Sequence, residues 1–116
     1  MAADAPLEAC GLLAGTGDVV QKVIPISNIL KSETLYRFSP SEQLAAFELI
    51  EREGLELLAI YHSHPKGSAR PSPTDVKEAY YSVVYVIWSF DDNKWQAGGY
   101  WIENGEIDEV SLDVFE

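Results

Sequence analysis

Short apolar runs separated by turn residues recur along the chain and predict a β-sheet. Thr16-Gly17-Asp18 separates the first two runs and predicts a hairpin, and Glu103-Asn104-Gly105 predicts a tight turn between the last two. The segment 82–88 is the most β-prone of all, and we expect it to be a central strand. In total, we expect strands at residues 9–15, 19–26, 34–38, 57–64, 82–88, 95–102 and 106–114.

Two segments carry helix-start signals. Ser39-Pro40-Ser41-Glu42 supplies an N-cap, a proline at the first helical position and a glutamate three residues after the cap. This capping box predicts a helix through Glu53, which Gly54 ends. Ser72-Pro73-Thr74-Asp75 predicts the first turn of a second helix that runs to about Tyr80. Strands mixed with helices indicate the α/β class, in which the sheet carries the helices on its faces.

The length and the charge of the chain limit how many domains it can have and what it can bind. The chain has 116 residues, of which 47% are hydrophobic, and this suits one domain spanning 1–116 with a substantial core. A net charge of −11 opposes binding to nucleic-acid phosphate and to anionic membranes. The single cysteine excludes an internal disulfide, and we find neither a signal peptide nor an apolar run of membrane-spanning length. We therefore expect a cytoplasmic protein that binds neither nucleic acid nor a membrane.

The segment 62–65, His-Ser-His-Pro, contains both histidines of the chain and predicts a metal site. It follows an apolar run that predicts a buried strand, and alternate residues of a strand share one face, so His62 and His64 should point the same way. Asp75 is a candidate for the third metal ligand, because the predicted second helix would fold back beside the strand. Ser72 and Asp75 also fit a simple helix cap, and the two interpretations are compatible. Two histidines and one carboxylate leave a fourth position for water, as catalytic zinc sites do.

These motifs resemble those of the JAMM (MPN+) zinc metalloproteases, in which a glutamate precedes H-x-H-P and then S-x-x-D. Here Glu8 stands before the two-histidine motif, and Ser72 and Asp75 follow it. The resemblance implies that His62, His64 and Asp75 bind Zn2+. It implies further that Glu8 is the catalytic general acid/base and that Ser72 stabilises the oxyanion. It also implies a single MPN-like (cytidine-deaminase-like) domain with a mixed, mostly antiparallel sheet flanked by helices, similar to stand-alone prokaryotic members.

By this resemblance, the chain would hydrolyse a peptide or isopeptide bond after the C-terminal Gly-Gly of a ubiquitin-like protein or sulfur carrier. The alternative is a non-catalytic, protein-binding scaffold of the MPN type, but such scaffolds lose metal ligands and every ligand position is filled here. A related DNA-repair-associated family carries H-x-H-P-S-G, whereas Lys66-Gly67 replaces its Ser-Gly in this chain. On its own, Glu8 would be interpreted as a solvated residue at a strand entrance, and only the joint match with the other motifs favours catalysis.

Two further expectations depend on the metal motif. Lys66, Arg70 and Lys77 gather around it in an otherwise acidic chain, and we expect a basic rim that steers an acidic partner. Cys10 lies two residues after Glu8 and could share its face, which would bring a thiol near the metal. The alternative for Cys10 is a small buried apolar residue.

Overall fold

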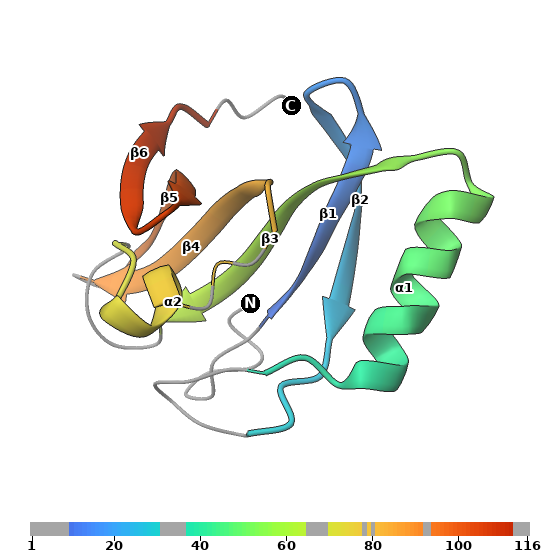
Figure 1. Ribbon diagram of the computed structural model, residues 1–116, viewed down its shortest axis with the longest axis horizontal. Helices are drawn as coiled ribbons and strands as arrows, with labels where there is room; N and C mark the ends of the chain where they lie inside the picture. The colour runs from blue at the N-terminus through green and yellow to red at the C-terminus, as the bar shows by residue number, and fades with distance from the viewer. Residues whose placement is uncertain are drawn as a thin grey trace.

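The computed structural model describes residues 10–30, 37–64, 70–77, 79, 81–91 and 94–112, which form one six-stranded sheet with two helices. The elements are β1 (Cys10–Thr16), β2 (Val19–Ile26), α1 (Pro40–Arg52), β3 (Glu56–His64), α2 (Pro73–Lys77), β4 (Val84–Asp91), β5 (Lys94–Glu103) and β6 (Glu106–Val110). The strand order is β2-β1-β3-β4-β5-β6 (Figure 1). Among the described strands, only β3 and β4 run parallel, which confirms the predicted mixed, mostly antiparallel sheet.

Left-handed residues close the two outer hairpins, as the turn sequences predict. Gly17 has a φ of 61° between β1 and β2. Asn104 and Gly105 have φ angles of 52° and 79° between β5 and β6. Two successive residues with positive φ give a turn whose twist matches that of the paired strands, and Asn-Gly suits this conformation. The two hairpins therefore follow directly from local sequence.

Several strand boundaries differ from the prediction. β4 begins at Val84 instead of residue 82, although it is an inner strand as expected. β6 ends at Val110 within the expected 106–114, and residues 113–116 lie outside the described part. Of the strand expected at 34–38, residues 34–36 are also outside it, while Phe38 forms only an isolated bridge to Asn28.

α1 begins with a cap but without the predicted reciprocal capping box. The Ser39 hydroxyl accepts a hydrogen bond from the Glu42 amide at 3.5 Å. The Ser39 amide, which the box would bond to Glu42, donates instead to the Ser27 carbonyl at 3.0 Å. The Glu42 carboxylate accepts from the Ser27 amide at 3.1 Å, so it ties the helix start to the end of β2. Gly54, with a φ of 68°, ends the helix as predicted.

α2 is shorter than the predicted helix from Ser72 to Tyr80. Its last residue is Lys77, and Ala79 is not helical. So short a helix gains little from its own hydrogen bonds, and Val76 and Ala79 pack against the apolar core instead. No helix among the described residues is long and apolar enough to cross a membrane.

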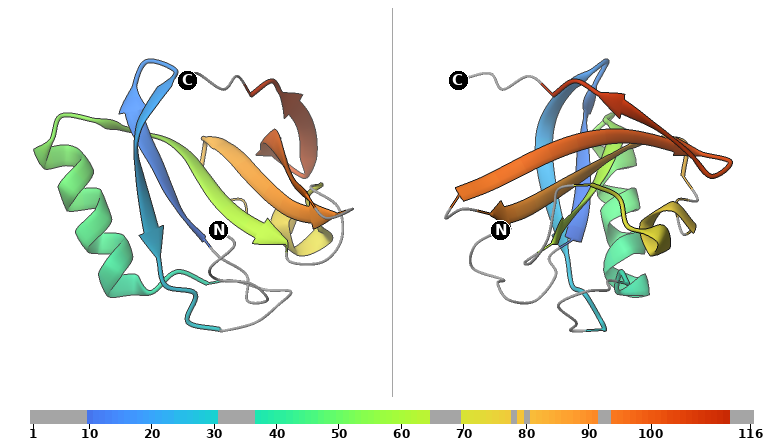
Figure 2. Two further views of the ribbon diagram at one scale, coloured as in Figure 1. Left: turned by 180° about the vertical axis from the view of Figure 1, so that it is seen from behind. Right: turned by 90° about the vertical axis from the view of Figure 1, so that its left-hand side faces the viewer.

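Both helices lie on the same face of the sheet, whereas helices on both faces would also have fitted the sequence (Figure 2). The main core forms between this face and α1. Its buried members are Leu12, Ala14, Ile26, Ala46, Ile50, Ile60, Tyr85, Ile87, Tyr100 and Ile102. The opposite face carries a smaller buried cluster of Ala59, Tyr61 and Val86, to which neither described helix contributes. The site described next lies on the helix-bearing face.

We predict that the helix-bearing face supplies most of the folding free energy. Leu12 is 0% exposed, so Leu12→Ala should lower the free energy of unfolding by about 2–5 kcal/mol through lost burial and the cavity left behind. Leu44→Ala on α1 is the matched control, since Leu44 is 61% exposed and its loss should change stability by less than about 0.5 kcal/mol. Urea denaturation measures both values. Equal effects of the two substitutions would show that this face is not the core.

Candidate metal centre

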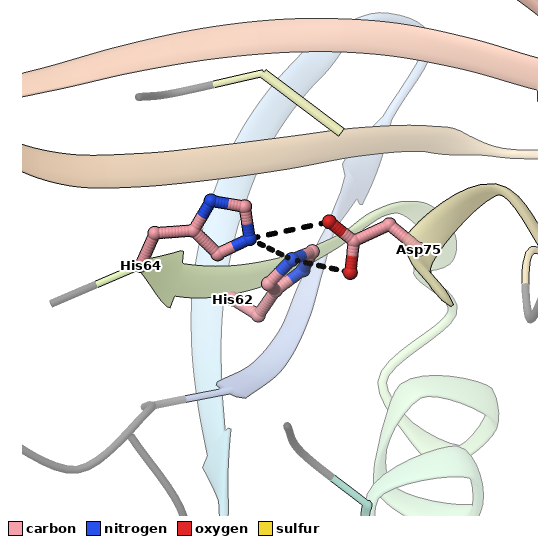
Figure 3. A group of neighbouring side chains, drawn as sticks. All are labelled: His62, His64 and Asp75. Atoms are coloured by element: carbon pink, nitrogen blue, oxygen red, sulfur yellow. Dashed lines mark hydrogen bonds and ion pairs between the residues drawn. The ribbon is translucent and has the colours of Figure 1, made fainter. Parts of the chain in front are cut away.

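The two histidines lie at the end of β3, an inner strand between β1 and β4. Their rings lie on the same face, as predicted, with 3.2 Å between the two Nε2 atoms (Figure 3). The ring centroids are 5.0 Å apart and the planes are inclined by 59°. The His62 side chain is only 1% exposed, and the His64 side chain is 14% exposed. The strand therefore presents two ring nitrogens to one point, one deep and one nearer the surface.

Asp75 comes from the first turn of α2, where Ser72 holds it in place. The Ser72 hydroxyl accepts a hydrogen bond from the Asp75 amide at 3.1 Å, and Asp75 Oδ2 accepts one from the Ser72 amide at 2.8 Å. These two hydrogen bonds give acceptors to the Ser72 and Asp75 amides, which have no acceptor within the helix at its start. The same carboxylate faces the histidines (Figure 3), so its role in the cap leaves it placed where a metal ligand would lie.

The three side chains converge. Asp75 Oδ1 lies 3.1 Å from His62 Nε2, and Oδ2 lies 3.2 Å from His64 Nε2. One donor atom from each residue lies within 4.8 Å of the others, so the group could hold a metal ion. In the tautomers that leave both Nε2 atoms without a proton, two lone pairs face a carboxylate. A cation among the three atoms gives each of these lone pairs an electron-pair acceptor.

Burial and the mutual contacts set the protonation states. Desolvation lowers the pKa of His62, the hydrogen bond and charge of Asp75 oppose this shift, and the charge of His64 adds to it. Burial alone would raise the pKa of Asp75, but hydrogen bonds from His62 and His64, together with the charge of His62, hold that pKa far below its usual range. Burial thus favours a neutral His62, and the contacts with the two rings favour an ionised Asp75. These are the protonation states in which such side chains bind metals.

The other predicted residues are only partly brought together. Glu8 and Lys66 lie outside the described residues. Arg70 lies 3.4 Å, Nη1 to Oε1, from Glu109 on β6, and both side chains are largely exposed. Lys77 is exposed in the last turn of α2. Because Arg70 already faces an acid, it contributes less to the predicted basic rim than the sequence alone indicated.

Cys10 lies directly opposite His62 in the antiparallel pairing of β1 with β3. Opposed residues of such a pair share a face, so the thiol and the His62 ring lie on the same side of the sheet. The thiol is buried and donates to the Ile26 carbonyl at 3.3 Å. The structure thus confirms the burial expected of a small apolar residue and also places Cys10 beside a candidate metal ligand.

Sequence reasoning missed Ser89, a buried serine of β4. Ser89 is the pairing partner of His64 across the parallel ladder, so its side chain lies on the histidine face. The sequence gives one signal for it: Ser89 is a serine at the next alternate position after Tyr85 and Ile87. That signal has meaning only once β4 is known to lie beside β3.

Comparison with known proteins agrees with the geometry. A family model described as prokaryotic homologs of the JAB domain matches residues 1–98. A probable TtuB-protein conjugate cleaving protease of Thermus thermophilus is 53% identical over 89 residues, which cover 76% of this chain and 60% of that protein. A CysO-cysteine peptidase of Mycobacterium tuberculosis is 36% identical over 120 residues, which cover 97% of this chain and 80% of the peptidase.

A solved structure shows the same fold. The solution structure of a protein from Desulfitobacterium hafniense matches with a TM-score of 0.87 at 33% identity, covering 98% of this chain and 82% of that protein. The matched region includes the β3–α2 segment that carries the candidate ligands. The chain spans 60% of the length of its Thermus relative, so that relative also contains sequence with no counterpart in the match.

The lowered pKa of His62 predicts that the metal-free protein loses stability in mild acid. The unfolded chain takes up a proton near pH ~6.5, while folded His62 stays neutral to lower pH, so stability falls as the pH drops through that value. We therefore expect the contribution of His62 to the free energy of unfolding to be smaller in mild acid than above neutral pH. Urea denaturation of chelator-treated protein measures it, as the difference between wild type and His62→Asn. A difference that does not change with pH would contradict the assignment.

Proposed function

The chain belongs to the prokaryotic homologs of the JAB domain, and we propose that it is a zinc-dependent protease. The proposed reaction is hydrolysis of a peptide or isopeptide bond after the C-terminal Gly-Gly of a ubiquitin-like protein or sulfur carrier. The observation that carries the proposal is the convergence of His62, His64 and Asp75 beside a Ser72 hydroxyl.

Donor type and spacing support zinc as the metal. Nitrogen and oxygen ligands about 2.0–2.1 Å from a tetrahedral zinc ion lie roughly 3.3 Å from one another. The two histidine Nε2 atoms are 3.2 Å apart, close to that value, and each faces its own oxygen of Asp75, at 3.1 Å for His62 and 3.2 Å for His64. Two histidines and one carboxylate are donors that zinc accepts readily, and three protein ligands are typical of catalytic rather than structural sites.

The proposed roles follow from the chemistry of each side chain. Bound zinc supplies Lewis-acid chemistry, which polarises a carbonyl and makes water nucleophilic near neutral pH. Glu8 is proposed to take the proton of the attacking water and return it to the leaving amine. The Ser72 hydroxyl accepts from the Asp75 amide, so its own hydrogen remains available to donate to the oxyanion. Ser72 is not proposed as a nucleophile, because both histidines would be committed to the metal and leave it no base.

The names of the relatives support a protein substrate. One relative is named for cleaving TtuB-protein conjugates and another as a CysO-cysteine peptidase. By analogy, the partner proposed here is a ubiquitin-like protein or sulfur carrier, whose Gly-Gly tail can bring its backbone close to a largely buried metal because it has no side chains. We place the reaction in the cytoplasm, where the single thiol of Cys10 would stay reduced.

Zinc content tests the site directly. We expect about one zinc ion per chain in wild type and in Glu8→Gln, and loss of zinc in Asp75→Ala, which removes one of three ligands. Asp18→Ala is the matched control, because Asp18 is an exposed aspartate in the β1–β2 turn. Elemental mass spectrometry after zinc reconstitution measures all four proteins. Wild type without zinc would instead favour the non-catalytic, protein-binding scaffold.

Hydrolysis tests the proposed roles of Glu8 and Ser72. With a Gly-Gly-tailed ubiquitin-like fusion as substrate, we expect zinc-loaded Glu8→Gln to lose about 10²–10⁴ in kcat through the missing proton transfer. Ser72→Ala should lose about 10²–10³ through the missing oxyanion donor. Ser39→Ala is the control for helix capping, because it removes the cap of α1 at a distance from the site and should lower stability alone. Equal kcat values for Ser72→Ala and Ser39→Ala would remove Ser72 from the reaction.

A further inference from the structure

Ser89 is a buried polar residue to which the site as described so far gives no role. Its side chain is 0% exposed, and within the described structure its hydroxyl has no hydrogen-bond partner. Buried hydroxyls nearly always have a partner, from the protein or from ordered water. Two of the other buried polar residues have evident roles: Ser39 caps α1, and His62 belongs to the metal centre. Ser89 therefore requires a separate explanation.

The position of Ser89 supplies that explanation. The parallel ladder pairs Ile60 with Tyr85, His62 with Ile87 and His64 with Ser89. On this face, the side chains of both strands change from apolar to polar towards the same end of the sheet. In β4, Ser89 is the first polar side chain after Ile87. Because paired residues of neighbouring strands share a face, the Ser89 side chain lies next to His64 on the face of the sheet that carries the metal centre.

We propose that Ser89 is a positioning residue of the metal centre, whose hydroxyl anchors a buried solvent molecule beside His64. A hydroxyl can donate one hydrogen bond and accept others, and a buried water typically makes about three bonds to polar groups that would otherwise lack them. Such a water would supply the partner that the described residues do not give the hydroxyl, which forms no hydrogen bond with any of them. Hydrogen-bonded groups around metal ligands fix the ligand orientation and strengthen metal binding. This inference rests on the proposed zinc site.

Ser89 should affect metal binding and folding differently. A hydroxyl bonded to buried solvent and to no protein group adds little to folding, and an alanine at this position would continue the apolar pattern set by Ile87. Ser89 should therefore add little to the stability of the metal-free protein. Its contribution should appear when the ligands bind a metal, and this separates a positioning role from a structural one.

The test is zinc affinity, measured on chelator-treated protein by competition with a chromophoric chelator. We expect Ser89→Ala to bind zinc about 10–100-fold more weakly than wild type, while the urea midpoint of its metal-free form is not lower. Ser89→Thr keeps the hydroxyl and should recover most of the affinity. Cobalt(II) substitution gives a second readout, because a reoriented ligand changes the visible absorption of the bound ion. Wild type and Ser89→Ala should therefore differ in spectrum.

Ser63→Ala is the matched control. Ser63 is a buried serine of the neighbouring strand, and it lies between the two histidines with its side chain on the opposite face. We expect Ser63→Ala to bind zinc as wild type does. Zinc affinity of Ser89→Ala within twofold of wild type would overturn the inference, as would an equal loss in Ser63→Ala. Failure of wild type to bind zinc would instead overturn the proposed zinc site.

Discussion

The parallel pairing of β3 with β4 is the constraint on which the candidate site depends. Parallel neighbours cannot be joined by a tight turn, so the chain must leave the end of β3 and cross over before it re-enters the sheet. α2 lies in that crossover, which brings Asp75 back to the strand end where His62 and His64 lie. The same pairing sets Ser89 beside His64. An antiparallel hairpin at this point would have left the histidines without their carboxylate.

Burial disfavours charge at the site, and for Asp75 the contacts with both histidines more than offset this. Burial keeps His62 neutral, while Asp75 keeps its charge although it is mostly removed from water. The apolar face beside them includes Leu12 and Ile87, both fully buried. Ile87 is the pairing partner of His62, so the core continues up to the candidate ligands. This abrupt boundary keeps water from the deep histidine and provides a low dielectric, in which a bound cation interacts strongly with the carboxylate.

Sequence patterns predicted the parts of the site that depend on near neighbours in the chain. The period of a strand placed His62 and His64 on one face, and the capping signal placed a carboxylate in the first turn of α2. Two of the failures involve contacts between distant segments. Glu42 bonds to Ser27 because the fold brings the end of β2 to the start of α1, and nothing near Glu42 in the sequence encodes this. Ser89 is recognised only through the strand order, which local patterns leave open.

Asp75 couples the folding of α2 to the chemistry of the site. Its Oδ2 accepts from the Ser72 amide and also faces His64, while Oδ1 faces His62. α2 has only five residues, too few to be stable alone, so its position depends on this cap and on the packing of Val76. The cap therefore orients the carboxylate before any metal binds, which reduces the entropy lost on binding. For the same reason, a change at Ser72 disturbs a candidate ligand even where the Ser72 hydroxyl never touches the substrate.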